Sequence, residues 1–448
     1  MLIIDSVKER TGERSFTLSR PLKLLLLKIK FEYIQCYIIT LKERTIVLKY
    51  CQHCDPCKQS SLHLSEKINK FLGSSEAFSL EPSKESKKLK LWYRDYENFI
   101  MNGFFSILLF FGLARERKAM PTKKLDNRTR VIIIEANSRK QPLNIIYFAG
   151  FQTRFFSTVI DGKKIYFERL PTNQAWQEYA VNFDDKYVLK KMLNKKNIPS
   201  PKGSGFTSKS RALDYARSSL KFPLVVKPQS GSLSRHTTCG ISNEDELISA
   251  IKIAKIVSTE FVVEEHIPGD VYRATLVDGE IVAACLRLPA SVVGDSESTI
   301  KNLIITKNNQ IIKRSKKLKN PHPQTIPINE ALSSRLKSQG LKLSSVLAKN
   351  KKVILHPKLL QICGSEAIDC TDKINTKNIQ LLKDTASLCR ARVVGIDLIA
   401  KDIARPFSAQ SFAVIEVNSL PNIDMHHFPT SGKPRNVAKS IWQSALSK

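Results

Sequence analysis

The sequence predicts an α/β protein with more than one domain, and three observations support this prediction. The chain has 448 residues, which is enough for two or three domains that each bury a core. Hydrophobic residues make up 42% and charged residues 25%, the ordinary balance of a soluble globular protein. From about Arg130 onward, short β-rich runs bounded by Asn, Gly and Pro alternate with helical segments.

Residues 1–98 are expected to form an irregular basic segment. Its one cluster of candidate metal ligands consists of Cys51, His53, Cys54, Cys57 and His63. The C-x-x-C-x-x-C spacing would suit zinc, but a second ligand pair at the usual distance is missing, so we do not favour a metal site. The nine cysteines are scattered and no signal peptide is evident, which predicts reduced thiols and a cytoplasmic location.

A small α/β domain is expected over residues 99–183, with the β-rich runs VIIIEAN, LNIIYFAG and KKIYFERL. The apolar run from Phe99 to Ala114 is shorter than the roughly 20 residues that cross a bilayer, and Asn102-Gly103 interrupts it. We therefore predict a buried or interfacial helix and do not expect membrane contact, although the basic residues that follow also suit a membrane interface.

A further domain is expected over residues 184–448, divided into subdomains at 184–270 and 271–448. Helical patterns cover 185–194 and 208–220, and a capping box of Asn243 with Glu246 starts another helix. A buried strand is expected at Leu224–Lys227, and the run FVVEE is expected to form another strand. Two more strands, Val393–Ala400 and Phe412–Val417, and a helix near Val437–Leu446 are expected to close the chain.

A β-hairpin is predicted where Asp278-Gly279 gives a type I′ turn between Arg273–Val277 and Glu280–Arg287. In a regular register Ala284 lies opposite Arg273, so Arg273 and Arg287 face opposite sides unless a bulge intervenes. Only one of the two arginines can then line a site, and we choose Arg287 because it leads into a loop.

The stretch from Lys301 to Lys358 is the most basic part of the chain, with 14 lysines and arginines and one acid, Glu330. Such a concentration suits an anionic partner, and the whole chain has a formal net charge of +31. No aromatic or glycine pattern interleaves the charges, so we favour a solvated surface insertion over a nucleic-acid interface.

Acids in apolar strands give the clearest functional signal. Asp397 lies in VVGIDLIA, where an acid is unfavourable unless it is paired or bound to a metal. Glu416 and Asn418 lie two residues apart in FAVIEVN, so both point to one face of a strand. Two acids and an amide on neighbouring strands suit Mg²⁺ held with the phosphates of a nucleotide. The alternative, buried acids that pair with lysines, stays open.

Two lysines are candidate phosphate ligands, because a lysine is a compact charge suited to phosphate oxygens. Lys227 ends the strand LVVKP, and Lys186 starts a helix. The segment after Lys227, QSGSLSRHTTCG, is small and hydroxylated and suits a flap over phosphates. In FVVEEHIPG, the exposed backbone suits an adenine edge, with Glu264 accepting a hydrogen bond from the amino group.

Taken in this order, residues 184–448 resemble the ATP-grasp region of cyanophycin synthetase and of the bifunctional glutathione synthetases. The matching stretches are DK at Asp185-Lys186, VVKP at Val225–Pro228, VEEHIPGDVYR at Val263–Arg273, RLPASVVGD at Arg287–Asp295, DCTD at Asp369–Asp372, GIDLIAKDI at Gly395–Ile403 and EVNSLPNIDMHHFP at Glu416–Pro429.

The resemblance implies an ATP-grasp fold, in which two subdomains clamp ATP behind a small α/β domain. The implied ATP contacts are Lys186, Lys227, Ser232, Ser234, Glu264, Glu265, Ile267 and Asp270. Asp397, Glu416 and Asn418 would bind Mg²⁺, or Mn²⁺ in its place, and Arg287 is the candidate catalytic residue that contacts substrate or phosphate.

The sequence also departs from that family. Ser234 and His236 replace glycines of the phosphate flap, and Val271 stands where an acid usually precedes Tyr-Arg, which leaves Asp270 one position early. The family's substrate loop, Arg-Arg-x-Ala-Asn-Leu-Ser-Thr-Gly-Gly, is replaced by the sequence from His356 to Ser365. The nucleotide half of the site therefore matches better than the substrate half.

The reaction that this resemblance implies is an ATP-dependent joining of a carboxylate to an amine through an acyl phosphate, with an amino acid or a peptide as substrate. We also expect a homo-oligomer. Two other classes stay open: a basic nucleic-acid-binding protein and a membrane-surface protein, each using the ATP-grasp scaffold without ligase activity.

Overall fold

The structure is a computed structural model of the chain. It describes residues 103, 105–123, 125–148, 150–171, 183–229, 234, 236–256 and 258–447, together with the backbone of four N-terminal strands. The chain divides into two compact units. The first unit comprises Met1–His63 and Lys202–His266, and the second unit comprises Leu64–Pro201 and Ile267–Lys448.

The N-terminal segment contains an antiparallel sheet, for which the sequence predicted no regular elements. Its strands are β1 (Ile4–Arg10), β2 (Glu13–Leu18), β3 (Ile39–Lys42) and β4 (Thr45–Leu48), in the order β1-β2-β4-β3. The cluster of cysteines around Cys54 lies outside the described residues.

Among the described residues of 202–266, the first unit also has a four-stranded antiparallel sheet with two helices. Its elements are β9 (Gly203–Phe206), α6 (Lys209–Ser219), β10 (Leu224–Pro228), β11 (Thr238–Ile241), α7 (Glu244–Lys255) and β12 (Phe261–Glu265), with the strand order β11-β10-β12-β9. The predicted start of α7 is confirmed, since the Asn243 side chain accepts a hydrogen bond from the Glu246 amide at 3.0 Å. Glu246 in turn accepts from the Ser242 amide, one residue before the position that a regular capping box uses.

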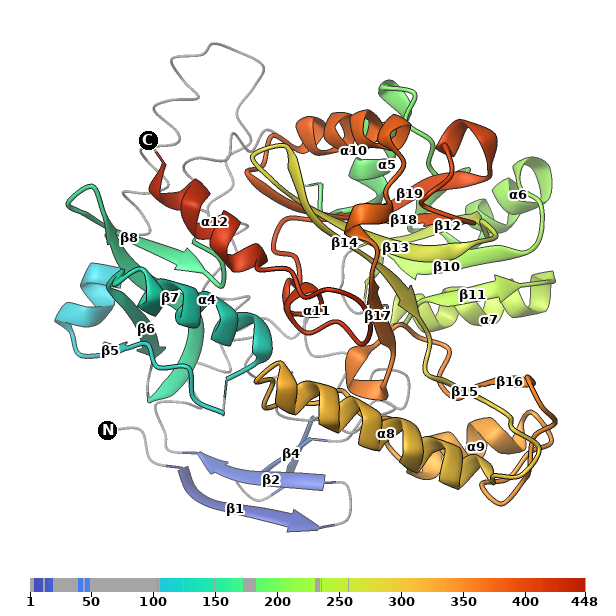
Figure 1. The fold of residues 1–448 in the computed structure, drawn as a ribbon, viewed down its shortest axis with the longest axis horizontal. Helices are drawn as coiled ribbons and strands as arrows, with labels where there is room; N and C mark the ends of the chain where they lie inside the picture. Colours follow the sequence, from blue (N-terminus) through green and yellow to red (C-terminus); the bar gives the residue numbers. More distant parts are fainter. Residues whose placement is uncertain are drawn as a thin grey trace. The chain divides into compact units, whose positions relative to one another are not determined.

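A five-stranded antiparallel sheet is the centre of the second unit (Figure 1). Its strands are β13 (Asp270–Val277), β14 (Glu280–Leu288), β17 (Glu366–Asp369), β18 (Val393–Ala400) and β19 (Phe412–Asn418), in the order β17-β14-β13-β18-β19. Helices α5 (Lys186–Lys195) and α10 (Thr376–Cys389) pack on one face and bury alternate strand residues such as Ile396 and Leu398. Asp397, which lies between these two residues in the sequence, therefore points to the opposite face of the sheet.

The hairpin β13–β14 contains a bulge, and this corrects the predicted placement of its arginines. The register shifts between Thr275 and Leu276, so that Arg273 lies opposite Cys285 rather than Ala284. Arg287, two residues beyond Cys285, therefore faces the same side as Arg273. Both arginines, and not Arg287 alone, belong to the polar face of the sheet.

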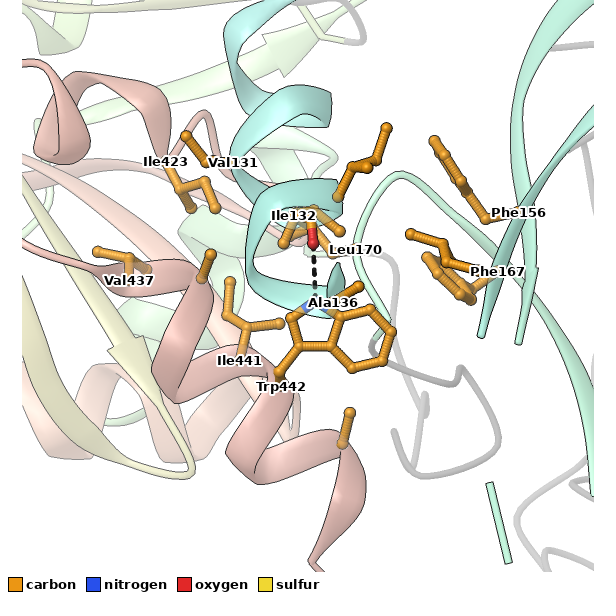
Figure 2. Packing of buried hydrophobic residues seen from close by; sticks show 14 of the residues in the cluster. Val131, Ile132, Ala136, Phe156, Phe167, Leu170, Ile423, Val437, Ile441 and Trp442 are labelled. Carbon is orange, nitrogen blue, oxygen red and sulfur yellow. Dashed lines mark hydrogen bonds between the residues drawn. The ribbon is translucent and has the colours of Figure 1, made fainter. Parts of the chain in front are cut away.

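The small domain near residues 105–171 shares a core with the five-stranded sheet. Its elements are β5 (Ala114–Lys118), α4 (Asn127–Ser138), β6 (Leu143–Phe148), β7 (Phe151–Ile160) and β8 (Lys163–Glu168), and α12 (Val437–Leu446) packs against α4. The indole Nε1 of Trp442 donates a hydrogen bond to the Ile132 carbonyl at 3.0 Å (Figure 2). The predicted terminal helix is confirmed.

The run VIIIEAN is a helix, which corrects its interpretation as a β-rich run. It lies inside α4, whose first turn is capped by Asp126 through a hydrogen bond from the Thr129 amide at 3.0 Å. Ile132, Ile133 and Ala136 are buried at helical spacing, so tertiary packing overrides the β preference of the isoleucines.

The basic stretch is folded, and most of its lysines are exposed to solvent. It contains α8 (Ile300–Lys317) and α9 (Glu330–Lys337), which lie beside the two-stranded sheet of β15 (Ser291–Val293) and β16 (Lys352–Ile354). Together these elements bury a core of their own: Ala290, Val292, Ile300, Ile304, Ile326, Leu332, Leu336, Leu347, Val353 and Leu355. Lys307 of α8 also donates to the Ser291 carbonyl at 2.7 Å and pairs with Glu366 of β17 at 2.5 Å, which ties this part to the central sheet.

Three single-turn 3₁₀ helices and one short α-helix are the remaining helices in the described part of the second unit. They are η4 (Gln361–Cys363), η5 (Thr371–Lys373), η6 (Phe407–Ala409) and α11 (Asp424–His427). None of the helices in the described part of the chain combines the length and the apolar character that a bilayer crossing requires.

Candidate active site

The polar face of the five-stranded sheet brings together five of the residues that the sequence singles out. Arg273 lies opposite Asp397, and Asp397 lies opposite Glu416 on the next strand. Asn418 lies opposite Gly395, two pairs further along and on the same face. With Arg287 from β14, the face presents two guanidinium groups, two carboxylates and an amide.

Asp397 is held by two arginines. Arg273 donates from Nε at 2.6 Å and from Nη2 at 2.5 Å to the two carboxylate oxygens, and Arg287 Nη1 lies 3.5 Å from Oδ1. Burial raises the pKa of Asp397, but the charges of Arg273 and Arg287 and their hydrogen bonds outweigh it and hold the pKa below its ordinary value. Asp397 is therefore an ionised acid in a buried position.

Glycine at position 395 makes room for the Arg273 guanidinium. A Cβ there would lie 2.9 Å from Arg273 Nη1 and 2.7 Å from the Pro421 side chain. Any larger residue would displace the arginine that holds Asp397. The run VVGID therefore places a small residue and an acid two positions apart on the same face of β18.

Lys186 and Glu416 face each other at the start of α5 and the end of β19. Lys186 Nζ lies 3.9 Å from Glu416 Oε1, and the lysine is the more buried of the two. Asp184 accepts a hydrogen bond from the Ser419 amide at 2.9 Å, and Asp185 caps α5. The structure thus assigns a positioning role to Asp184, which the sequence analysis did not single out, although its neighbour Asp185 is part of the DK match.

A second buried contact lies under the arginines and was not foreseen from the sequence. His426 Nε2 and Thr275 Oγ1 lie 2.8 Å apart, and the histidine is 2% exposed. Burial, and then the charge of Arg273, lowers the pKa of His426 to about 3, so its ring is neutral at ordinary pH. A histidine in EVNSLPNIDMHHFP shows no periodic or spacing signal that would reveal this contact.

Arg287 connects the polar face to the altered substrate loop. Its Nη2 donates to the Leu359 carbonyl at 2.7 Å. Gly364, in the same loop, has φ 79°, and a Cβ there would lie 2.4 Å from Ile326. The loop is therefore packed on the core of the basic stretch at one end and hydrogen-bonded to Arg287 at the other.

In the first unit, the candidate nucleotide residues Lys227 and Glu264 form a buried ion pair with a distance of 2.6 Å. Lys227 pairs in register with Val262, and Glu264 with Val225, so the two side chains are diagonal neighbours on one face of the sheet. Gly203 lies opposite Glu264, and a Cβ at position 203 would lie 2.4 Å from the Glu264 Cβ. A larger residue at position 203 would therefore collide with Glu264.

The remaining nucleotide candidates are at or near chain bends. Ser234 and His236 have φ 51° and 54°, the left-handed region that glycine adopts without strain, at the two positions where the related flap has glycines. Glu265 accepts a hydrogen bond from the Lys221 amide at 3.1 Å. Ile267 is half-buried, Asp270 is exposed at the first position of β13, and Ser232 lies outside the described residues.

The donor set on the polar face fits a hard divalent cation. The described residues contain no cluster of three or more His, Cys, Asp or Glu that could hold a metal, so the set would consist of Asp397, Glu416 and the Asn418 amide. A carboxylate has about four acceptor positions, and the arginines use three of those on Asp397. A cation would take the Asn418 amide oxygen; the buried Nδ2, which has no hydrogen-bond partner within the described residues, is a donor and suits an anionic oxygen instead.

Regions of other known proteins resemble this chain. No protein-family model matches it. The chain is similar to cyanophycin synthetase of Synechocystis sp., with 30% identity over 318 residues, which are 70% of this chain and 35% of that protein. It is also similar to the glutathione biosynthesis bifunctional protein GshAB of Enterococcus faecalis, with 31% identity over 326 residues, which are 71% of this chain and 42% of that protein.

Among solved structures, a bifunctional glutathione synthetase from Pasteurella multocida superposes with a TM-score of 0.52 and 26% identity, covering 72% of this chain and 44% of that one. The chain therefore spans less than half the length of these relatives.

Proposed function

We propose that this chain is an ATP-dependent carboxylate–amine ligase. The premise is that it has the ATP-grasp fold and is a homologue of cyanophycin synthetase and of the bifunctional glutathione synthetases. In the first step a substrate carboxylate attacks the γ-phosphorus of ATP, which gives an acyl phosphate and ADP. In the second step an amine attacks the acyl carbon and releases inorganic phosphate, which leaves an amide bond. The protein's contribution is positioning and charge stabilisation.

The observation that carries the proposal is the polar face of the second unit. Arg273 and Arg287 are fixed by Asp397 and by the Leu359 carbonyl, so their remaining N–H groups are preorganised donors. Donors held in place in this way stabilise the negative charge of phosphoryl and carboxylate oxygens. We assign Arg287 to direct contact with substrate or phosphate, since it is the more exposed of the two arginines.

Asp397, Glu416 and Asn418 would hold Mg²⁺, or Mn²⁺ in its place. The bound ion would offset the negative charge of the phosphate oxygens. Lys186, whose ammonium group lies 3.9 Å from Glu416, is positioned to interact with the same anionic groups.

The resemblance supports proposed nucleotide contacts in each of the two units. In the first unit they are Lys227, Ser232, Ser234, Glu264 and Glu265. In the second unit they are Lys186, Ile267 and Asp270. The buried Lys227–Glu264 pair supports the first group, because the acid fixes the position of the positive charge of Lys227.

The proposed substrates are small carboxylates and amines, either amino acids or peptides. A cytoplasmic location and a homo-oligomeric state complete the proposal. The rival interpretation, a nucleic-acid-binding scaffold, is not favoured, since no aromatic side chains interleave the lysines and arginines of the basic stretch.

The test uses the full chain with Mg-ATP and a panel of amino acids and dipeptides offered singly and in pairs. We expect phosphate release that depends on one carboxylate substrate. In the absence of the amine, hydroxylamine should trap the activated acyl group as a hydroxamate. Glu297→Gln, which changes an exposed acid of the same unit, is the matched control for Glu416→Gln. ATP binding without phosphate release for any pair in a broad panel would speak against ligase chemistry.

A further inference from the structure

A small polar cavity lies at the C-terminal end of α8, beside the altered loop at residues 356–365. Its walls are α8, this loop and the segment 428–430 that follows α11, all of which belong to the second unit. The cavity has about 30 Å³ of space for the centre of a water molecule. Since about 10–15 Å³ of such space holds one water, the cavity has room for two waters or for one group of similar size, such as a carboxylate.

The cavity is lined by buried hydrogen-bonding groups that have no partner in the described part of the chain. Ser315 and Ser365 are 8% and 6% exposed, and neither hydroxyl group hydrogen-bonds to another described residue. Asn320 is 8% exposed; its Oδ1 accepts from the His322 amide at 2.9 Å, which leaves Nδ2 as a donor to the cavity. The polar side chains of the lining are Arg314, Ser315, Asn320, Gln324, Gln361 and Ser365.

The charge at the cavity is positive. Arg314 donates from Nε to the Pro429 carbonyl at 2.7 Å and from Nη2 to the Gly432 carbonyl at 2.6 Å. These bonds fix its guanidinium group, and its Nη1 makes no hydrogen bond to any residue that the structure describes. Lys316 and Lys317 lie in the same last turn of α8, and no acid is among the described residues that line the cavity.

Backbone acceptors at this end of α8 are already in use. The Arg314 carbonyl accepts from the Leu318 amide at 3.0 Å, and the Ser315 carbonyl accepts from the Asn320 amide at 2.8 Å. The negative end of the helix therefore offers little to a cation. Donors without a partner beside a fixed guanidinium group suit an anionic oxygen.

Two of the lining residues come from the loop that departs from the family pattern. Gln361 stands where that pattern has leucine, and Ser365 stands where it has the second glycine. Leucine and glycine have no side-chain hydrogen-bonding group. Much of the polarity of the cavity is therefore a property of this chain's own loop.

The cavity lies close to the polar face of the central sheet. Arg287 pairs with Ala367 of β17, and Ser365 precedes Ala367 by two residues, about 7 Å along the strand direction. Arg287 also donates from Nη2 to the Leu359 carbonyl of the same loop at 2.7 Å. A substrate held at Arg287 can therefore reach the cavity with a second functional group.

We propose that this cavity binds a carboxylate of the substrate that does not react, and that Gln361 and Ser365 determine the specificity for it. The inference rests on the proposed ligase function. The substrate class is an amino acid or a peptide that keeps one free carboxylate through the reaction. Arg314 supplies the positive charge, and the amide and hydroxyl groups supply the hydrogen bonds.

The test compares substrates that differ in one functional group. For each substrate that supports phosphate release, the carboxylates are replaced by carboxamides one at a time. Replacement of the reacting carboxylate abolishes turnover. Replacement of the carboxylate bound in the cavity should raise KM about tenfold or more and change kcat little, because charge-assisted hydrogen bonds are lost.

The double variant Gln361→Leu with Ser365→Gly introduces the residue types of the family pattern and should lose this discrimination. Its KM for the carboxylate form should rise to that for the carboxamide, with an unchanged KM for Mg-ATP. Gln361→Glu should reverse the preference, because two carboxylates in one cavity repel each other. Gln310→Leu, which changes an exposed glutamine of α8, is the matched control and should discriminate as the unchanged protein does.

Calorimetry with alanyl-aspartate and alanyl-asparagine separates this inference from the proposed function. If no substrate supports phosphate release, but the acidic dipeptide binds more tightly and the double variant removes the difference, the ligase proposal fails and the cavity keeps its assignment. If substrates turn over without any discrimination, or if the double variant raises KM equally for both forms, the ligase proposal stands and the inference on the cavity is wrong. Loss of neither turnover nor discrimination in the double variant would overturn it as well.

Discussion

Two buried aspartates of the second unit differ in their electrostatic surroundings. Asp397 is 3% exposed, and two arginines hold its pKa below the ordinary value. Asp424, at the start of α11, is 7% exposed, and burial, followed by the charge of Asp126, raises its pKa to about 6 in spite of Arg128. Similar burial therefore gives opposite shifts.

The difference lies in hydrogen bonding to a cation. Both oxygens of Asp397 accept from Arg273, whereas Asp424 Oδ1 has no hydrogen-bond partner among the described residues. A buried acid is thus not a functional signal by itself; the groups that fix its charged form make it one. The predictions below test this contrast, from the largest expected effect to the smallest.

Removing the bidentate partner of Asp397 should have the largest effect on stability. Arg273→Gln leaves a buried carboxylate without its main cation, and we expect the free energy of unfolding to fall by about 3–5 kcal/mol. Arg287→Gln is the matched variant, because Arg287 reaches the same carboxylate only at 3.5 Å, and it should lose less than about 1 kcal/mol. Urea unfolding measures both. Equal losses in the two variants would show that the carboxylate does not depend on the bidentate contact.

Glu416→Gln should abolish turnover while sparing stability. The substitution keeps the side-chain volume and removes a charge that the proposed metal site needs, so phosphate release should fall about a hundredfold or more. The side chain is 29% exposed and Lys186 lies at 3.9 Å, so the melting temperature should change little. A variant that melts much earlier, yet keeps its specific activity at low temperature, would make Glu416 a structural partner of Lys186. Glu297→Gln should change neither quantity.

The strands and the helix at the C-terminus could be predicted because their sequence patterns agree with their burial. Val393–Ala400 is apolar and is buried on both faces of the sheet. The acid within it, Asp397, indicates which face carries the polar side chains. The run VIIIEAN could not be assigned in the same way, because a short apolar run has no period that distinguishes a strand from a helix. In the structure it lies in a helix whose first turn is capped by Asp126. The core of the basic stretch could not be predicted, because the seven residues that the stretch contributes to it are spaced irregularly between lysines.

The site was predictable where it depends on a regular ladder and unpredictable where it depends on a bulge. Alternation alone places Glu416 and Asn418 on one face. The one-residue shift at Thr275 and Leu276 reverses the side on which Arg287 lies, and no residue type in the hairpin signals it. The contact between Thr275 and His426 joins positions 151 residues apart, and one sequence contains no information on such pairs.

Substitution of Lys227 tests whether the buried ion pair of the first unit also contributes to nucleotide binding. Lys227→Ala should weaken Mg-ATP binding about tenfold or more by calorimetry, since a point charge near the phosphates is lost. The pair with Glu264, only 4% exposed, means that this variant should also lose stability. The double variant Lys227→Met with Glu264→Gln should recover part of that stability without recovering ATP affinity. If affinity returned with stability, the lysine would act only through the fold.

Asp424 should give the smallest effect, with a pH dependence opposite to that of Asp397. Its pKa is about 6 in the folded chain against 3.8 ordinarily, so between these values the folded chain binds more protons than the unfolded one. The free energy of unfolding must then fall as the pH rises from about 4 to about 6 and stay level above that range. Because a shift of one pKa unit corresponds to about 1.36 kcal/mol, the fall is at most about 3 kcal/mol. Asp424→Asn removes the penalty, but the amide is still buried with incomplete hydrogen bonding, so the net gain at pH 7 should be about 1 kcal/mol. The measurement is urea unfolding of both proteins across this pH range. A variant that parallels the unchanged protein at every pH would mean that Asp424 titrates normally, and the contrast with Asp397 would then reflect the arginines alone.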